Sequence, residues 1–129
     1  MAGLSFSVFK DKIIGGSKRQ TIRGIRKHPI KEGETLYMWW KQRSPEREKL
    51  GEAKCISVKL IRLDDDSVRI LDPENLCNTT VYSTKEKLDR FAVSDGFNNW
   101  QELVEFFETT HGLPFKGVLI EWDSIKTPF

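Results

Sequence analysis

The alternation of apolar and polar residues along the chain predicts a series of short strands. Residues 4–8 alternate regularly, whereas residues 35–40 are apolar on both faces, as in a strand that is covered on both sides. The longest alternating run covers residues 52–63, and Asp64-Asp65-Asp66 has the composition of a hairpin turn after it. Further strands are expected at residues 20–23, 67–71, 79–82 and 116–125.

Three segments have the spacing of short helices. The first covers residues 9–14 and is ended by a pair of glycines, and the second covers residues 84–93. The third is the most regular, because Asn99 can cap it with Glu102 three residues further on. Strands in a mostly antiparallel order, interrupted by a few helices, place the chain in the α+β class.

The composition is that of one soluble domain covering residues 1–129. Hydrophobic residues make up 38% of the chain and charged residues 31%, and no apolar run approaches the ~18 residues of a membrane helix. Because the N-terminus also lacks an apolar signal core, we expect a cytoplasmic protein, and a monomer. Cys55 and Cys77 are expected to be reduced core residues. With His28 and His111 as the only histidines, we predict no metal site and no cofactor.

The formal charge is concentrated near the N-terminus. Residues 10–31 contain eight basic residues and one acid, a charge of +7, which leaves −5 for the rest of a chain whose total is +2. A basic segment on an acidic body favours an anionic partner, such as phosphate or a nucleic-acid backbone. A solvated surface strand would show the same charge.

The spacing within this segment favours a site. Gly15-Gly16 allows a tight turn, after which an extended chain would place Arg19, Thr21 and Arg23 on one face. Lys18 lies at the turn, from which its amine can reach that face. A Walker A loop is excluded because Ser17 separates the glycine from the lysine, and Arg19 stands where Ser or Thr is required.

Residues 16–23, Gly-Ser-Lys-Arg-Gln-Thr-Ile-Arg, resemble the G-x-K-x-x-T-x-R signature of the ASCH domains. The resemblance extends over nearly the whole chain, through Gly33-Glu34, Leu50-Gly51, Asp95-Gly96-Phe97 and the closing Ile120-Glu121-Trp122. It implies a PUA-like barrel of five or six mostly antiparallel strands, flanked by short helices.

The resemblance also implies a function. ASCH domains are similar to RNA-binding PUA domains, so we expect a basic cleft that binds RNA or a modified nucleoside or nucleotide. Ser17, Arg19, Arg23 and Arg26 would bind the ligand. Tyr37 and Trp39, or Trp40 if the register is opposite, would form a stacking platform for a base unless these rings are core.

One enzyme type of the family removes the acetyl group from 4-acetylcytidine with a lysine, a threonine and an acid. Lys18 and Thr21 match the first two by position, and Asp95 falls where the enzyme type has glutamate. Thr21 could attack the acyl carbon once a base takes its proton. The alternative is that Lys18 and Asp95 form a structural ion pair. A ribonuclease, which the family also includes, has the least support because no histidine pair suggests it.

Overall fold

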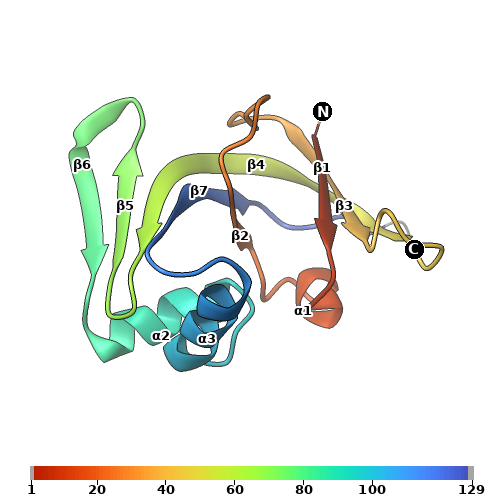
Figure 1. The fold of residues 1–129 in the computed structure, drawn as a ribbon. Helices are drawn as coiled ribbons and strands as arrows, with labels where there is room; N and C mark the ends of the chain where they lie inside the picture. Colours follow the sequence, from red (N-terminus) through yellow and green to blue (C-terminus); the bar gives the residue numbers. More distant parts are fainter. Residues whose placement is uncertain (1, 128–129) are drawn as a thin grey trace.

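The computed structural model describes the backbone of residues 2–127, with the side chains of residues 2 and 75–78 left out, and it confirms the α+β class (Figure 1). Its elements, in chain order, are β1 (Ala2–Phe6), α1 (Lys10–Ile14), β2 (Gln20–Arg23), β3 (Thr35–Trp40), β4 (Glu48–Leu63), β5 (Val68–Asp72), β6 (Asn75–Tyr82), α2 (Lys85–Ser94), α3 (Trp100–Thr110) and β7 (Phe115–Trp122).

The sheet is built around β4, which is long enough to pair with three other strands. Its first half pairs with β3, and its second half lies between β5 and β7. β6 continues the sheet beyond β5, β2 pairs with β7, and β1 pairs with β3. All pairings are antiparallel except that of β1 with β3, so the mostly antiparallel order is confirmed.

The described strands number seven rather than five or six, and their hydrogen bonds do not close a barrel. β1 pairs with β3 alone and β2 with β7 alone, so no backbone ladder joins β1 to β2 in the described part of the chain. A side-chain hydrogen bond from Arg23 of β2 to the Ser5 carbonyl of β1 connects them. The gap between the end of β1 and β2 is called the seam below. Because no backbone ladder joins β1 to β2, side chains have to connect these two strands at the seam.

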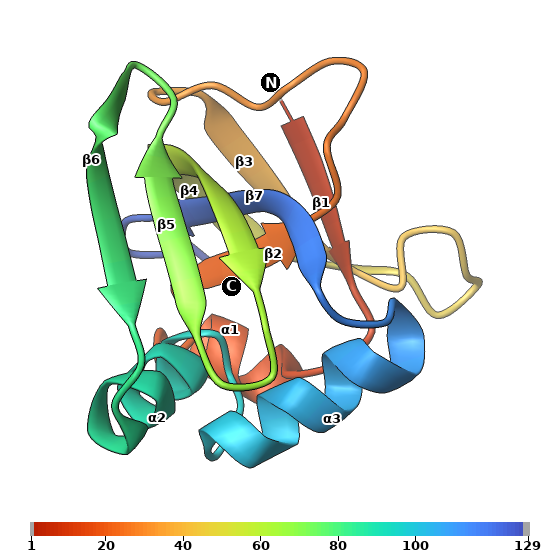
Figure 2. The same ribbon diagram turned by 60° about the vertical axis from the view of Figure 1, so that its left-hand side comes forward.

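The core has two parts, one on each side of the central strands. α2 and α3 pack on one side (Figure 2). Leu103 and Phe107 of α3 belong there to the same hydrophobic cluster as Leu119 of β7. On the other side Phe6 of β1 and Met38 of β3 meet the next residue of β7, Ile120. Neighbouring residues of one strand therefore enter different cores, as the two-residue period of a strand requires.

Cys55 lies in the second core with a free thiol, whereas the side chain of Cys77 lies outside the described residues. Among the described residues, no helix has both the length and the apolar character needed to cross a membrane. The same part of the chain holds no group of three or more His, Cys, Asp or Glu residues arranged to bind a metal ion.

Candidate functional site

Buried polar side chains gather at one place in the molecule. In the described part of the chain, the buried residues with polar or charged side chains are Lys18, Gln20, Thr21 and Asp95. Burying such groups costs free energy unless they are hydrogen-bonded. Their concentration beside the seam therefore makes this place the candidate functional site. Three of the four are the residues that the motif predicted as catalytic.

Local backbone structure brings Lys18 and Asp95 together from distant parts of the chain. The turn after α1 contains Gly16 at φ 84°, and the Lys18 backbone N–H then donates to the Lys12 carbonyl at 3.0 Å. Asp95 is the C-cap residue of α2, and the Arg19 N–H donates to the Ser94 carbonyl at 3.2 Å. The start of β2 is thus tied to the end of α2.

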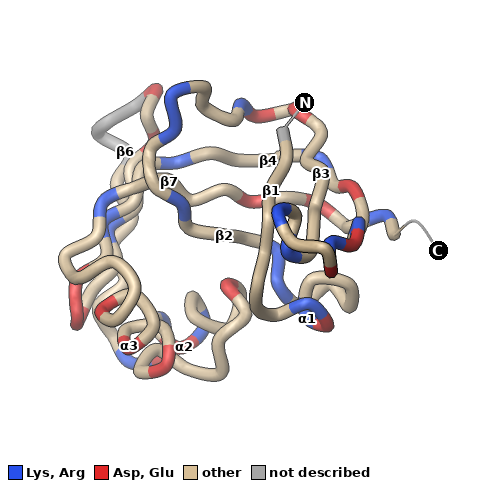
Figure 3. Tube along the Cα trace, turned by 45° about the vertical axis from the view of Figure 1, so that its right-hand side comes forward, with Lys and Arg blue, Asp and Glu red and all other residues tan. Residues whose placement is uncertain are grey.

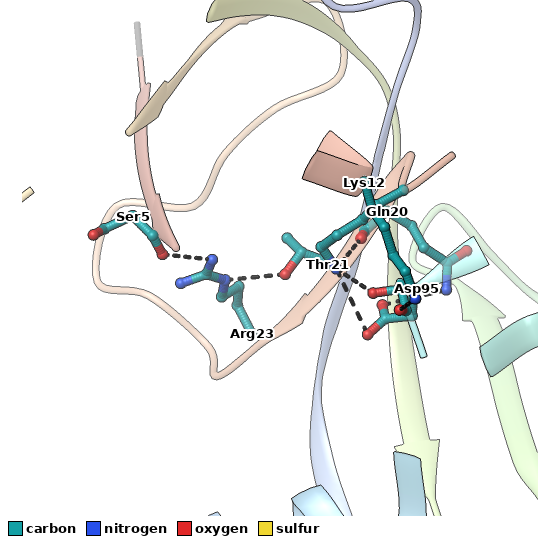
Figure 4. A network of polar contacts seen from close by, with 8 residues as sticks. Ser5, Lys12, Gln20, Thr21, Arg23 and Asp95 are labelled. Carbon is teal, nitrogen blue, oxygen red and sulfur yellow. Dashed lines mark hydrogen bonds and ion pairs between the residues drawn. The ribbon is translucent and has the colours of Figure 1, made fainter. Parts of the chain in front are cut away.

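Figure 4 draws the polar network around Gln20, Thr21, Arg23 and Asp95. In this network the Lys18 ammonium has two hydrogen-bond acceptors and one carboxylate oxygen at ion-pair distance. Its Nζ donates to the Gln20 carbonyl at 2.8 Å and to the Asp95 carbonyl at 2.5 Å, and it lies 3.7 Å from Asp95 Oδ2. The Gln20 amide Nε2 donates to Asp95 Oδ1 at 3.4 Å. Two hydrogen bonds to carbonyl oxygens and the nearby Asp95 carboxylate compensate the ammonium for its burial.

Burial shifts the pKa values of Lys18 and Asp95 toward neutral pH. It lowers the pKa of Lys18 to about 8, against the attraction of Asp95 and with the help of the Arg23 charge. It raises the pKa of Asp95 to about 6, against the stabilising charge of Lys18 and the Gln20 hydrogen bond. Groups that titrate near neutral pH can exchange protons, which is a property of catalytic pairs.

Thr21 belongs to a second half of the network, built on Arg23. The Arg23 guanidinium donates from Nε to Thr21 Oγ1 at 3.2 Å and from Nη2 across the seam to the Ser5 carbonyl at 2.9 Å. The Phe6 ring links the halves, because Arg23 Cζ lies 4.8 Å and Lys18 Nζ 5.8 Å from its centroid. The Phe6 ring therefore lies against both Lys18 and Arg23, and Thr21 is bound to Arg23.

Phe9 covers the site in an unusual backbone conformation. Its φ is 65°, in the left-handed region that bulky residues rarely adopt. Its ring lies 5.6 Å from Lys18 Nζ and meets Phe97 edge to face at 4.9 Å. Gly96, at φ 106°, receives this ring, since a Cβ there would lie 2.8 Å from Phe9 Cδ2. Backbone strain of this kind is often found at functional sites.

Sequence analysis missed Phe6, Phe9 and Gln20 as members of the site. Gln20 lies within the signature, so its position alone could have indicated it. The two phenylalanines carry no such signal, because their approach to Lys18 depends on how β1 and α1 fold back over β2.

Three of the predicted ligand-binding residues lie at the surface, outside the network. Ser17 is exposed, and its hydroxyl donates to the Lys12 carbonyl at 3.4 Å. Arg19 is also exposed and donates from Nε to the Gly16 carbonyl at 3.1 Å, so it does not converge with Thr21 and Arg23. Arg26 lies exposed in the loop after β2.

The expected stacking platform faces away from the network. Leu36 and Met38 of β3 enter the core that contains Phe6, so Tyr37 and Trp39, between and after them, lie on the opposite face. There Lys49 Nζ lies 5.2 Å from the Tyr37 ring. Trp40 packs against the edge of the core, beneath the amines of two lysines.

The network is closed to solvent rather than open as a groove. Lys18, Thr21 and Asp95 are 3%, 5% and 4% exposed, while Arg23 and Phe9 are half-buried around them. A ligand would therefore meet Phe9 and Arg23 first. A site of this form suits one small group of a ligand better than a long strand running through it.

No known protein family, curated protein or solved structure matches this chain when it is compared with them. The similarity to ASCH domains thus rests on the motif residues, and the function has to be argued from the chemistry of the site.

Proposed function

We propose that the chain is an ASCH-like domain, with an open form of the PUA-like barrel, that binds a nucleoside or nucleotide of RNA at the seam. The observation that carries the proposal is the convergence of the buried polar side chains with two phenyl rings and Arg23 at an unpaired strand edge. A nucleobase needs this combination, because it is recognised by stacking on its face and by hydrogen bonds at its edge.

Each part of the site has a role in this binding. Phe9, half-buried at the entrance, offers a ring face for the base. Thr21 and Gln20, buried behind Phe9 and Arg23, offer hydrogen-bonding groups to its edge when those two side chains move aside. Arg23 uses two of its N–H groups on Thr21 and Ser5, which leaves others for a carbonyl or a phosphate.

The test is calorimetric titration with cytidine, CMP and 4-acetylcytidine at low salt. We expect saturable binding that Arg23→Met weakens by about tenfold or more, the scale of a lost charge-assisted hydrogen bond. Arg43→Met, in the exposed loop after β3, is the matched control and should bind as the wild type does. Absence of saturable binding, or equal affinity of the two variants, would overturn the proposal.

A second candidate function, hydrolysis of an acylated cytidine, is favoured by the pKa values of Lys18 and Asp95. In this reaction neutral Lys18 takes the Thr21 proton while the hydroxyl oxygen bonds to the acyl carbon, and Arg23 stabilises the oxyanion. The C–N bond then breaks, the cytosine amine receives the proton, and water releases acetate from Thr21. Lys18 has to leave the Gln20 carbonyl to reach Thr21.

Release of acetate from 4-acetylcytidine tests this candidate. Lys18→Met and Thr21→Val should each lower kcat by about a thousandfold or more, and the double variant should be no worse, since members of one catalytic unit fail together. If Lys18→Met retains most of the turnover, Lys18 is not the base and binding alone remains as the proposed function.

A further inference from the structure

A cavity of about 530 Å³ lies on the same sheet face as Thr21 and Arg23. Its walls are the loop between β2 and β3, strands β4 and β7, and the turn between β5 and β6. The volume falls within the range of small-molecule sites. None of Lys18, Thr21 and Asp95 lines it, so it is a separate space from the buried network.

Strand register places the cavity directly beside the seam. Thr21 pairs with Ile120, which pairs with Val58 on β4. Side chains of paired residues lie on the same face of a sheet. Thr21, Ile120 and Val58 therefore form a row across the sheet, and the last two of them line the cavity floor. A second row runs in the same way from Arg23 through Val118 to Leu60.

The cavity has an apolar lining that the described chain leaves uncovered. Ile25 in its loop wall is 74% exposed and Leu60 on its floor is 37% exposed. The remaining apolar residues of the lining are Pro29, Ile30, Val58, Val118 and Ile120. An occupant therefore needs an apolar or planar body.

Charges on two sides of the cavity narrow the chemistry of the occupant. Arg26, Lys31 and Glu32 come from the β2–β3 loop and Lys59 comes from β4, whereas Asp72 and Glu74 come from the end of β5 and the turn after it. Neither Arg26 nor Glu74 forms an ion pair within the described residues. Carboxylates repel a simple anionic amphiphile but accept hydrogen bonds from sugar hydroxyls, so the charges suit a molecule with one anionic group and a hydroxyl-bearing ring.

Two charges act on the Arg23 guanidinium, that of Arg26 from the loop after β2 and that of Asp95 from the buried side. Burial lowers the pKa of Arg23, Asp95 opposes this effect, and the charge of Arg26 adds to it. An anion placed between the two guanidinium groups would relieve this repulsion. Arginine pairs are well suited to a phosphate, which each can bind through two N–H groups.

We propose that the cavity binds the base and ribose of a second nucleotide, joined to the nucleoside at the seam by a phosphodiester held between Arg23 and Arg26. This inference rests on the proposed function and specifies its ligand as a two-nucleotide step of RNA. The base lies on Leu60 and Val118, and the ribose hydroxyls donate to Asp72 and Glu74. The 2′-hydroxyl then distinguishes RNA from DNA.

The experiment compares cytidine, the ribodinucleotide CpC and its deoxy counterpart in calorimetric titrations. CpC should bind wild-type protein at least about tenfold more tightly than cytidine, because the second nucleotide adds stacking and a charge-assisted contact. Leu60→Trp places an indole ring where the second base would lie and should remove this gain while leaving cytidine affinity unchanged. Ile56→Trp is the matched control, since Ile56 lies on the same strand, is 50% exposed and does not line the cavity.

The ribose contact has its own comparison. Deoxy CpC should bind more weakly than CpC, and Glu74→Ala should reduce the difference. Thermal unfolding of each variant identifies any that fail to fold.

If cytidine binds but CpC gains nothing, or if the two tryptophan variants behave alike, the cavity inference is overturned and the seam site stands. If wild-type protein binds CpC in a Leu60-dependent manner but not cytidine, the seam site fails instead. Binding of neither overturns both.

Discussion

Lys18 is buried, although a lysine side chain is normally exposed to water. Its ammonium is buried against two carbonyls and a carboxylate, and even so its pKa falls to about 8. Hydrogen bonding to Asp95 and Gln20 thus offsets desolvation only in part. A buried pair of this kind is weak evidence for stability, and its retention is better explained by chemistry at the site.

The first prediction follows from the two pKa values. Asp95 binds its proton more tightly in the folded chain, so stability should fall as pH rises from about 4 to about 6; Lys18 binds its proton less tightly when folded, so stability should rise from about 8 to about 10. Each change amounts to about 3 kcal/mol at most. Urea unfolding across this pH range measures it.

Lys18→Met separates the two effects. The alkaline rise should disappear, and the fall on the acid side should extend above pH 6 because Asp95 loses the cation that lowers its pKa. An unchanged alkaline rise in the variant would mean that another group titrates there.

Gly96 gives a second prediction at the scale of one residue. An alanine Cβ would lie 2.8 Å from the Phe9 ring and 3.2 Å from Lys18 Cδ, at a φ of 106°. Gly96→Ala should therefore destabilise the chain by about 3 kcal/mol, from left-handed strain together with overpacking. Gly112→Ala is the control, because Gly112 has a φ of 82° but nothing within 4 Å of its Cβ, and strain alone should cost about 1 kcal/mol. Equal losses of stability in denaturant unfolding would mean that the Phe9 contact contributes nothing.

At the scale of elements, the local sequence pattern predicted the positions of strands and the caps of helices. The strand over residues 35–40 matches β3 residue for residue, and Asn99 caps α3 through its side chain as its spacing to Glu102 indicated. β4 begins at Glu48, four residues before its predicted start, because charged residues at a strand edge look like loop. The parallel pairing of β1 with β3 and the absence of a closed barrel depend on contacts between distant segments, which no local pattern encodes.

Some residues of the candidate site could likewise be predicted from the local sequence, and others could not. The resemblance predicted Lys18, Thr21 and Asp95 as one group, and all three are buried in one polar network, with Lys18 beside Asp95 and Thr21 bound to Arg23. Arg19 was misplaced because alternation starts with the strand at Gln20, one residue later. Alternation also separated Tyr37 and Trp39 from their neighbours correctly, but it could not tell which face of β3 is covered.

The seam gives a prediction about the coupling of two strands. Arg23 reaches from β2 to the Ser5 carbonyl of β1, across edges that share no backbone ladder in the described chain. Arg23→Met keeps the length of the side chain but removes this bond, so amide hydrogen exchange in β1 should accelerate by about tenfold, the effect of losing about 1.4 kcal/mol. Arg26→Met should leave β1 unchanged. Equal exchange rates in the two variants would show that β1 is held by β3 alone.

At the scale of the whole molecule, folding redistributes the basic segment that the sequence concentrates. Lys18 is buried, Lys12 donates to the Gly96 carbonyl, and Lys10 pairs with Glu48. The trace coloured by charge shows basic residues on several elements rather than on one continuous face (Figure 3). Arg26, in the loop after β2, is an exposed cation whose charge acts on Arg23 at the seam.

The last prediction concerns how salt weakens RNA binding. For a short single-stranded RNA, the logarithm of the binding constant should fall linearly with the logarithm of salt concentration, with a slope of about −0.7 for each phosphate neutralised. Arg26→Ala should reduce the slope by about one such contact, and it avoids the loss of β1 contacts that Arg23→Ala would cause. Arg43→Ala should leave the slope unchanged, because a ligand of two nucleotides at the seam does not extend to the loop after β3. If Arg43→Ala reduces the slope as much as Arg26→Ala does, the RNA follows a longer basic path over the surface, and the two-nucleotide ligand is ruled out.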